Sequence, residues 1–207
     1  MMGVMANRLA AGTTAAQDRA VDTLSRWMAA EQKKVFLLCC RMLQDRDEAD
    51  SAAQDVFLKA FRALRNGDVE DLEDPGRWLT RVAVNTCLDR LRSQRWQLWR
   101  RRPNPEDEQT LLLLARSPAP DAESQALAGQ IAKRLARALS ELSPRQRAVF
   151  VLRHYEGMAL DEIGRSLGLE TGTVKAHLAR AIAKLRDDLK DLYGLPRGPR
   201  LRKEGRS

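Results

Sequence analysis

The sequence predicts an all-α protein: two small helical domains joined by a flexible linker, the C-terminal one a helix-turn-helix. Apolar residues recur at helical spacing along most of the chain, and no segment shows the alternation of a strand. The composition changes at residues 103–128, where four prolines, five acidic residues and one arginine indicate a linker with a net charge of −4. After this linker, residues 157–190 have the pattern of two helices across a glycine-containing turn.

Length and charge narrow the class of protein. The 207 residues suit one or two domains, each with enough chain for a core. A net charge of +8 favours a polyanionic partner, either nucleic acid or an anionic membrane. The longest apolar run, Val35 to Cys40, is far shorter than the ~20 residues of a membrane span, and residues 1–14 lack the pattern of a secretory signal. We therefore expect a cytoplasmic protein with no stable membrane insertion.

The residues that usually carry enzyme or metal chemistry are not grouped in this sequence. Cys39, Cys40 and Cys87 lie in apolar helical stretches without Cys-x-x-Cys spacing, which indicates buried free thiols and no disulfide framework or zinc site. His154 and His177 have no spaced ligand partner, and the sequence contains no glycine-rich phosphate loop. We expect no metal, no cofactor and no catalysis.

The first domain is expected over residues 24–102. A loose arm or a weak first helix precedes it at residues 1–23, which are rich in alanine and polar residues. Its first regular helix is predicted from Leu24 to Leu43, because apolar residues recur there at helical spacing. These residues are Trp27, Val35, Leu38, Cys39, Met42 and Leu43.

A second helix is predicted to end near Leu64, with Asp45 or Asp47 as its N-cap. One of its faces is apolar and suits a core: Ala49, Ala53, Val56, Phe57, Ala60, Phe61 and Leu64. The other face is polar, and it carries Asp50, Gln54, Asp55 and Lys59. From the residues alone, this polar face is an ordinary solvated surface.

A third helix is predicted to start near Pro75, since proline suits the first helical turn. It buries either Trp78 or Leu79, together with Val82, Ala83, Leu88 and Leu91. From Arg90 to Arg102 the chain has six arginines and no acidic residue, interleaved with Trp96 and Trp99. Two interpretations are open: phosphate contact with base stacking, or a solvated helix end whose cations suit the helix dipole.

The linker at residues 103–128 includes Leu111 to Leu114, a run that is too apolar for a plain spacer. It either docks on a flanking domain or meets a partner. The second domain is expected over residues 129–193, where Ser143-Pro144 indicates a capped helix start. Residues 194–207 are expected to form a disordered basic tail.

The two-helix pattern near the C-terminus indicates DNA binding. Gly168 supplies the permissive backbone that a sharp turn needs between the two helices. The second helix has an apolar stripe, and Lys175, His177 and Arg180 lie largely off it. A helix that is buried on one side and basic on the other suits a major groove. The alternative is an ordinary helical hairpin, because short patterns of this kind are easily matched.

Two blocks, taken in this order, resemble the sigma factors of bacterial RNA polymerase, specifically the short extracytoplasmic-function group. In the first block the resemblance lies in residues 49–61, Arg77-Trp78-Leu79, Arg81-Val82-Ala83, Asn85 and Asp89-Arg90-Leu91-Arg92. In the second block it lies in Leu142-Ser143-Pro144, Glu162-Ile163, Leu167-Gly168 and Gly172-Thr173-Val174-Lys175. Two matching blocks with an acidic linker between them make a stronger case than either block alone.

The resemblance implies a promoter-specificity subunit that is not itself an enzyme. Its partners would be core RNA polymerase, through the beta and beta′ subunits, promoter DNA, and an anti-sigma factor. The second helix would dock on the polymerase through Asp50, Gln54 and Asp55. The third helix would capture the minus-ten element through Trp78, Arg81, Asn85, Arg90, Arg92 and Arg95. The last helix would read the minus-thirty-five element through Thr171, Thr173, Lys175, His177 and Arg180.

Several residues depart from the pattern of that family. Ser51 stands where an acidic residue is usual, which removes one charge from the polymerase-facing patch. Ala159 replaces a Ser or Thr N-cap, a loss of about 1 kcal/mol unless Asp161 compensates. Gly164 replaces an alanine inside a helix, at a cost of up to about 1 kcal/mol. His177 replaces a common arginine, so the preferred promoter sequence cannot be inferred from the family.

A different class of function also fits part of the sequence. A helix-turn-helix regulator with a helical sensor domain would bind duplex DNA without being a polymerase subunit, usually as a dimer on a two-fold site. The arginine-tryptophan segment and the acidic linker fit that alternative poorly. Binding to core polymerase distinguishes the two hypotheses.

Overall fold

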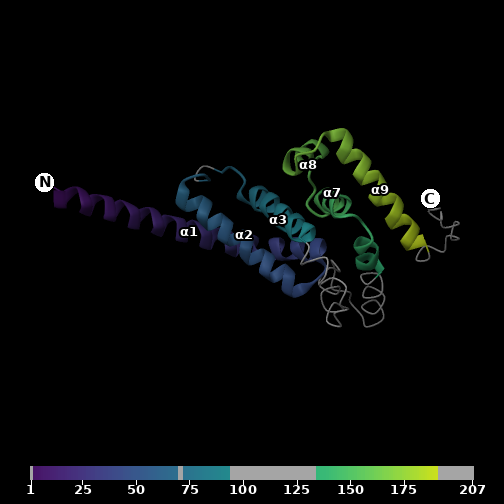
Figure 1. The fold of residues 1–207 in the computed structure, drawn as a ribbon, viewed down its shortest axis with the longest axis horizontal. Helices are drawn as coiled ribbons and strands as arrows, with labels where there is room; N and C mark the ends of the chain where they lie inside the picture. Colours follow the sequence, from purple (N-terminus) through teal and green to yellow (C-terminus); the bar gives the residue numbers. More distant parts are fainter. Residues whose placement is uncertain (1, 70–71, 94–133, 191–207) are drawn as a thin grey trace. The chain divides into compact units, whose positions relative to one another are not determined.

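The computed structural model describes the backbone of residues 2–69, 72–93 and 134–190, and within these ranges the side chains from residue 17 onward. Every regular element in these ranges is a helix, which confirms the predicted all-α class (Figure 1). The chain divides into two compact units, residues 1–110 and 111–207. The predicted linker, with Leu111 to Leu114, and the predicted basic tail at residues 194–207 lie outside the described residues.

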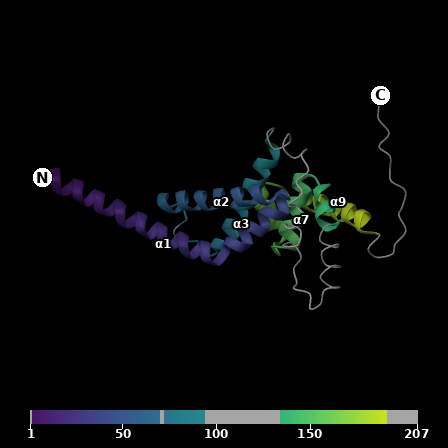
Figure 2. The ribbon, with the colours of Figure 1, turned by 90° about the horizontal axis from the view of Figure 1, so that it is seen from below.

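Unit 1 contains the helices α1 (Met2–Leu43), α2 (Arg46–Asn66) and α3 (Pro75–Arg92), which pack against one another (Figure 2). Helix α1 begins at Met2, whereas the sequence predicted a regular helix only from Leu24. The extra residues are rich in alanine, the residue with the highest helix propensity. This N-terminal part of α1 extends beyond α2 and α3 (Figures 1 and 2). Ala20 is buried in a cluster with Leu64 of α2 and Val69.

Local signals determine where the helices of unit 1 begin. Of the two candidate caps for α2, Asp45 is the one used, because its carboxylate accepts a hydrogen bond from the Glu48 backbone N–H at 2.9 Å. Gln44 has a φ of 58°, so the chain reverses between α1 and α2 within two residues. Asp74 caps α3 in the same way and Pro75 occupies its first turn, as predicted.

The core of unit 1 follows the predicted apolar stripes with one shift on α3. The α2 stripe is buried except for Phe61, which is half-buried. On α3, Leu79 is fully buried whereas Trp78 is half-buried, which settles the alternative between them. Val82 is only half-buried, and Val84 takes its place in the core. The stripe is wider than apolar periodicity indicated, because Thr80 and Thr86 are buried as well.

The three cysteines are buried free thiols, as predicted. Burial is the main cause that raises the pKa of Cys40 to about 12, and the neighbouring Cys39 raises it further. A hydrogen bond with Cys39 and burial raise the pKa of Cys87 well above its ordinary value. The thiolate forms are therefore disfavoured, and these side chains serve as small core residues.

Unit 2 contains a helical segment at residues 134–140, followed by α7 (Pro144–His154), α8 (Leu160–Leu167) and α9 (Thr171–Leu189). Ser143 begins α7 with a capping box that includes Gln146, and Pro144 occupies the first turn, as the sequence predicted. The core joins the first segment to α9 through Ala138, Leu139, Leu142, Ala181 and Leu185.

A fully buried arginine on α7 organises the start of unit 2. Arg147 is 0% exposed, and its Nε donates to the Leu139 carbonyl oxygen at 2.9 Å. Its Nη2 donates to the Ser140 carbonyl oxygen at 3.1 Å. These carbonyls lie at the C-terminal end of segment 134–140, where helical partners are lacking and positive charge is favourable. On the same end, Lys184 of α9 donates to the Glu141 carbonyl oxygen at 3.1 Å.

Helix α8 corrects two expectations, one at its start and one at its contact with the turn that follows it. Glu162, not Asp161, compensates for the missing N-cap side chain at Ala159: its carboxylate accepts from the Ala159 backbone N–H at 2.8 Å, while Asp161 pairs with Arg165. Gly164 is no simple defect either. A Cβ there would lie 2.6 Å from the Leu169 carbonyl oxygen, so only glycine allows this close approach.

Gly168, with a φ of 63°, ends α8 in the left-handed conformation, and its N–H bonds to the Gly164 carbonyl oxygen. The predicted role of Gly168 in the turn is confirmed. Within the described ranges, no helix combines the length and the hydropathy needed to cross a bilayer.

Candidate functional site

The polar face of α2 presents two of the three residues expected to meet the polymerase. Asp50 and Gln54 are exposed, and the Gln54 Nε2 donates to Asp50 Oδ2 at 2.8 Å. Because they are one helical turn apart, this contact holds both side chains in one orientation. Together they offer a carboxylate and an amide in a fixed arrangement.

Asp50 and Gln54 also line an apolar groove between α1 and α2, with a volume of about 920 Å³. Side chains from both helices form this α1/α2 groove, among them Leu24, Met28, Phe36, Phe57 and Leu58. Leu58 is 53% exposed and is one of two exposed large hydrophobic residues in the described part of the chain. The sequence analysis did not predict this groove. The only sign of it in the sequence was Leu58, an apolar residue that lies outside the buried stripe of α2.

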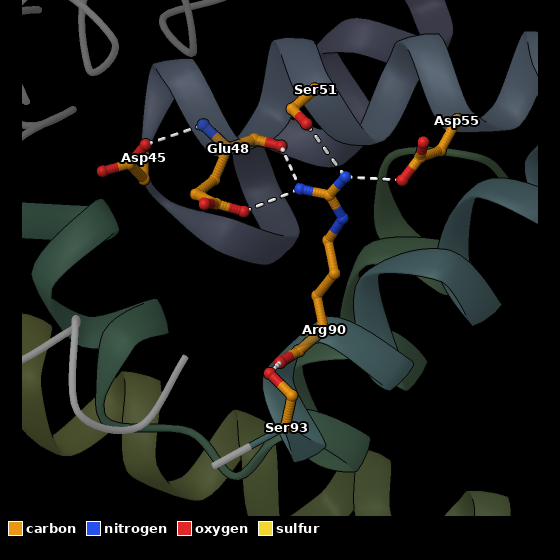
Figure 3. Close-up of polar contacts among 6 residues, drawn as sticks. All are labelled: Asp45, Glu48, Ser51, Asp55, Arg90 and Ser93. Carbon is orange, nitrogen blue, oxygen red and sulfur yellow. Dashed lines mark hydrogen bonds and ion pairs between the residues drawn. The ribbon is translucent and has the colours of Figure 1, made fainter. Parts of the chain in front are cut away.

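The third expected polymerase residue, Asp55, lies in a different environment, because it faces Arg90 of α3. Its Oδ2 accepts a hydrogen bond from Arg90 Nη2 at 2.6 Å (Figure 3). The other terminal nitrogen, Nη1, donates to Glu48 Oε2 at 2.7 Å, and Nη2 also donates to Ser51 Oγ at 3.0 Å. The structure thus brings together two residues, Asp55 and Arg90, that the resemblance assigned to two different partners.

In this Arg90 cluster, made of Arg90, Glu48, Ser51 and Asp55, the carboxylates favour the charged form of the arginine. Burial alone would lower the pKa of Arg90, but the hydrogen bonds that it donates to Asp55 and Glu48, together with the charges of these carboxylates, outweigh burial, and the pKa of Arg90 is raised. The Arg90 side chain is 21% exposed, against 47% for Asp55. The Ser51 hydroxyl accepts one of the hydrogen bonds of Arg90. The serine, which stands where an acidic residue is usual in the family, therefore also takes part in the contact between α2 and α3. Glu48 was not among the expected residues, and only its place in the first turn of α2 distinguished it.

The remaining minus-ten residues are distributed along α3. Arg81 and Asn85 are exposed and lie one turn apart, so they share a face of the helix. Arg92 is exposed and pairs with Asp89 at 3.1 Å. Trp78 packs instead against Trp27 of α1, with ring centroids 6.1 Å apart, in the cluster that contains Leu64 and Val69. Arg95 lies outside the described residues, together with Trp96 and Trp99.

The N-terminal half of α9 carries the residues expected to read the minus-thirty-five element. Thr171, Thr173, Lys175 and Arg180 are exposed. His177 differs from them because it is half-buried, and its Nδ1 is buried with no hydrogen-bond partner among the described residues. Burial, and then the positive charges of Arg180 and Arg145, lower the pKa of His177. The lowered pKa favours the neutral imidazole, which can offer a hydrogen bond to DNA.

Metal ligation has no candidate in the described ranges, where no group of three or more His, Cys, Asp or Glu side chains is placed to hold an ion. His154 stacks on Phe150, with ring centroids 4.5 Å apart.

Comparison with known families assigns both halves of the chain. Residues 27–97 match the family model of sigma-70 region 2, and residues 132–185 match that of sigma-70 region 4. These ranges contain the Arg90 cluster, the start of α9 and the α1/α2 groove except for Val21 and Leu24.

Individual relatives agree with these matches. The chain is 33% identical over 177 residues to ECF RNA polymerase sigma factor SigM of Mycobacterium tuberculosis. This match covers 86% of this chain and 81% of SigM. It is 32% identical over 158 residues to ECF RNA polymerase sigma factor SigE of Mycolicibacterium smegmatis, covering 75% of this chain. That second match spans 57% of SigE, so SigE includes a large part that has no counterpart in the alignment.

The fold is also similar to that of a solved protein, the sigma factor RpoE of Bartonella quintana in complex with the anti-sigma factor NepR. The TM-score is 0.58 with 18% sequence identity, over 80% of this chain and 96% of RpoE. At this identity the comparison supports the fold alone.

Proposed function

Because the chain belongs to the extracytoplasmic-function group of RNA polymerase sigma factors, we propose that it binds core polymerase, recognises the minus-thirty-five and minus-ten elements and promotes strand opening. The observation that carries this proposal is that each unit has an exposed polar face formed by residues of the expected kind. On α2 and α3 these are Asp50, Gln54, Arg81 and Asn85, and on α9 they are Thr171, Thr173, Lys175 and Arg180. A polymerase subunit works where the chromosome lies, so the proposal includes a cytoplasmic location.

Docking on the polymerase is assigned to the α1/α2 groove and its rim. The groove offers apolar surface, including Leu58, beside the ordered pair Asp50 and Gln54. A complementary partner is a segment with apolar side chains and basic residues. Apolar burial would supply most of the affinity, and the carboxylate would raise the association rate and fix the register.

Strand capture is assigned to the face of α3 that carries Arg81 and Asn85. Opening requires a base to leave the stack, at a cost of a few kcal/mol, which contacts to the extruded base and its phosphates offset. The Asn85 amide has both donors and an acceptor and so can read a base edge, while Arg81 suits a backbone phosphate. Arg92, exposed in the last turn of α3, suits another phosphate, and the proposal also assigns Arg95, which follows α3 in the sequence, to the minus-ten element.

Recognition of the minus-thirty-five element is assigned to the start of α9. Thr171 and Thr173 lie at the helix N-terminus, where backbone N–H groups and the dipole favour a phosphate. Lys175 and Arg180 are exposed and charged, so they suit phosphates or guanine edges. His177, being neutral, would contribute a hydrogen bond to a base.

An anti-sigma partner is part of the proposal, because a protein of similar fold is known in complex with the anti-sigma factor NepR. The α1/α2 groove is exposed in the structure of the chain alone, and a partner that covers it would compete with the polymerase.

The deciding experiment is reconstitution with core polymerase and a promoter library, with start sites read from the transcripts. We expect defined start sites that require the chain, and no specific footprint of the chain alone on duplex DNA. Transcription no higher than with core polymerase alone would reject the proposal. A self-sufficient footprint on a two-fold duplex site would instead favour a conventional helix-turn-helix regulator.

Two substitutions test the residue assignments in that system. Asn85→Ala should slow promoter opening more than it weakens the closed complex, and equal losses would contradict base capture. Arg180→Ala should weaken promoter recognition without changing the affinity for core polymerase. Arg186→Ala, an exposed arginine nearer the end of the same helix, is the matched control and should change neither quantity.

A further inference from the structure

Arg90 joins the helix assigned to polymerase docking to the helix assigned to DNA. It lies in the last turn of α3, and its guanidinium reaches Glu48 and Asp55 on α2 (Figure 3). Glu48 and Asp55 are seven residues apart, which is close to two helical turns, so they lie on the same face of α2. One planar guanidinium bridges both carboxylates, and this contact restrains α3 both along and around the axis of α2.

The surroundings of Arg90 disfavour a direct contact with DNA. A phosphate that approached this guanidinium would meet the carboxylates of Glu48 and Asp55, which bind it at 2.7 and 2.6 Å. Like charges repel at such distances. Two negative charges surround one positive charge, so the Arg90 cluster as a whole does not attract an anion. Arg81 differs because it is exposed and has no such pair of carboxylates in the ion pairs described for α3.

The rest of α3 is restrained at other points. Trp78 packs on Trp27 near the start of the helix, and Lys59 of α2 donates to Thr86 Oγ1 at 2.8 Å near its middle. Arg90 restrains the C-terminal end. Asn85 directly precedes Thr86 and lies between the contacts of Trp78 and Arg90, so the direction in which it faces depends on the position of α3 on α2.

We propose that Arg90 is a positioning residue, which, through Glu48 and Asp55, holds α3 so that docking of α2 on the polymerase also places Asn85 for strand capture. The inference rests on the proposed function, and it reassigns Arg90 from DNA contact and Asp55 from polymerase contact. Both residues act on opening through the geometry between α2 and α3. Lysine cannot replace Arg90, because an ammonium lacks the fork that binds two carboxylates.

The test compares single and double variants in complex with core polymerase on a promoter selected from the library. For Arg90→Met, Arg90→Lys and Asp55→Asn, we expect core affinity within about twofold of the wild type and opening slower by about tenfold or more, as expected for a misplaced reacting group. The Arg90→Met/Asp55→Asn double variant should open no more slowly than Arg90→Met alone, because both act through one contact. Additive losses, or weaker core binding by Asp55→Asn, would overturn the inference.

Salt dependence separates positioning from phosphate contact. On a forked promoter probe with a single-stranded minus-ten segment, each lost phosphate contact lowers the slope of log K against log salt concentration by about 0.7. We expect this change for Arg81→Met and no change for Arg90→Met. A flatter slope for Arg90→Met, or full activity of Arg90→Lys, would show that Arg90 contacts DNA.

Two controls keep these outcomes interpretable. Arg62→Met removes an exposed arginine from α2 and should leave core affinity and opening unchanged. Circular dichroism establishes folding, and if Arg90→Met does not fold, Arg90→Lys and Asp55→Asn make the same comparison. Failure of the wild-type chain to open promoters would overturn the proposed function and this inference with it, whereas wild-type opening with the opposite variant pattern would overturn the inference alone.

Discussion

Arg90 in unit 1 and Arg147 in unit 2 each join two helices, but they do so in contrasting environments. Arg90 is partly exposed and binds carboxylates of another helix. Arg147 is fully buried and binds the carbonyls that end segment 134–140. When an exposed ion pair is lost, water can hydrate both charges and the cost is small. When a buried carbonyl loses its donor, water cannot reach it and the cost is larger. Arg147 is therefore expected to determine whether unit 2 folds, and Arg90 how the helices of unit 1 are oriented.

The largest expected effect comes from Arg147→Met. The substitution keeps an apolar stem but removes the donors to the Leu139 and Ser140 carbonyls. The Leu139 oxygen still accepts from the Leu142 N–H at 3.2 Å, and each group left unsatisfied costs about 1–3 kcal/mol. Unit 2 should lose most of its stability while unit 1 keeps its own. Hydrogen exchange of backbone amides in the full chain measures the two units separately. Undiminished protection in α7 and α9 would show that the guanidinium is dispensable.

The next effect is expected for Gly164→Ala, a substitution that helix propensity alone would call stabilising by up to about 1 kcal/mol. The new Cβ would lie 2.6 Å from the Leu169 carbonyl oxygen, so the turn or the helix must move. We expect a net destabilisation of about 1–3 kcal/mol, the usual cost of overpacking. Thermal unfolding provides the measurement, and Gly172→Ala, where a Cβ would meet nothing within 4 Å, is the matched control. A higher melting temperature for Gly164→Ala would contradict the close approach.

Salt separates the two arginines further. Arg90→Met should destabilise unit 1 by about 1–2 kcal/mol at low salt, because it removes the charged hydrogen bonds to Glu48 and Asp55. The partial exposure of these groups keeps the loss small. That difference from the wild type should shrink as salt is raised to about 1 M, where screening acts within a few ångströms. The effect of Arg147→Met should persist, since buried groups are screened much less. Equal salt sensitivity of the two variants would contradict the contrast between them.

The smallest expected effect concerns His177 and pH. Its pKa is lowered in the folded state, so below the ordinary value of about 6.5 the unfolded chain takes up a proton first. Stability of unit 2 should therefore be fully present above pH 6.5 and should fall as the pH drops toward the folded-state pKa. Thermal unfolding between pH 5 and pH 8 tests this, and His177→Gln should flatten the profile. An unchanged profile in that variant would assign the dependence to another group.

Most of the fold could be predicted from the sequence because the signals that begin and end its helices are local. Pro75 and Ser143-Pro144 were assigned as helix starts and are confirmed, since a cap and a proline act within one turn, whereas the Asp74 cap was not assigned. For residues 1–23 the sequence left a loose arm or a weak first helix open, because they lack a regular apolar stripe although their propensity is helical, and in the structure α1 begins at Met2. The stripe of α3 was placed with Val82, and Val84 is the residue in the core.

The candidate site was less predictable, because its geometry depends on contacts between distant residues. Arg90 and Asp55 are 35 positions apart, and either would serve as a surface charge when considered alone. From the sequence, Gly164 is a residue of low helix propensity inside a helix. The reason for glycine at this position is the carbonyl oxygen of Leu169, which leaves no room for a Cβ. Glu162 rather than Asp161 compensates at Ala159, because the third helical position reaches back to the cap. The assignments to polymerase and promoter stay predictions.

The contact between Arg147 and segment 134–140 determines where this chain can be divided. A chimaera that exchanged promoter-reading modules between regulators would be joined naturally at Ser143, where α7 begins. Such a junction would remove the carbonyls that Arg147 and Lys184 bind. The Arg147 guanidinium would then lie against a segment of another protein that was not selected to bind it. A transplantable module therefore has to include the carbonyls of Leu139, Ser140 and Glu141 and the helical segment that carries them, so its boundary lies upstream of the helix start that Ser143-Pro144 marks.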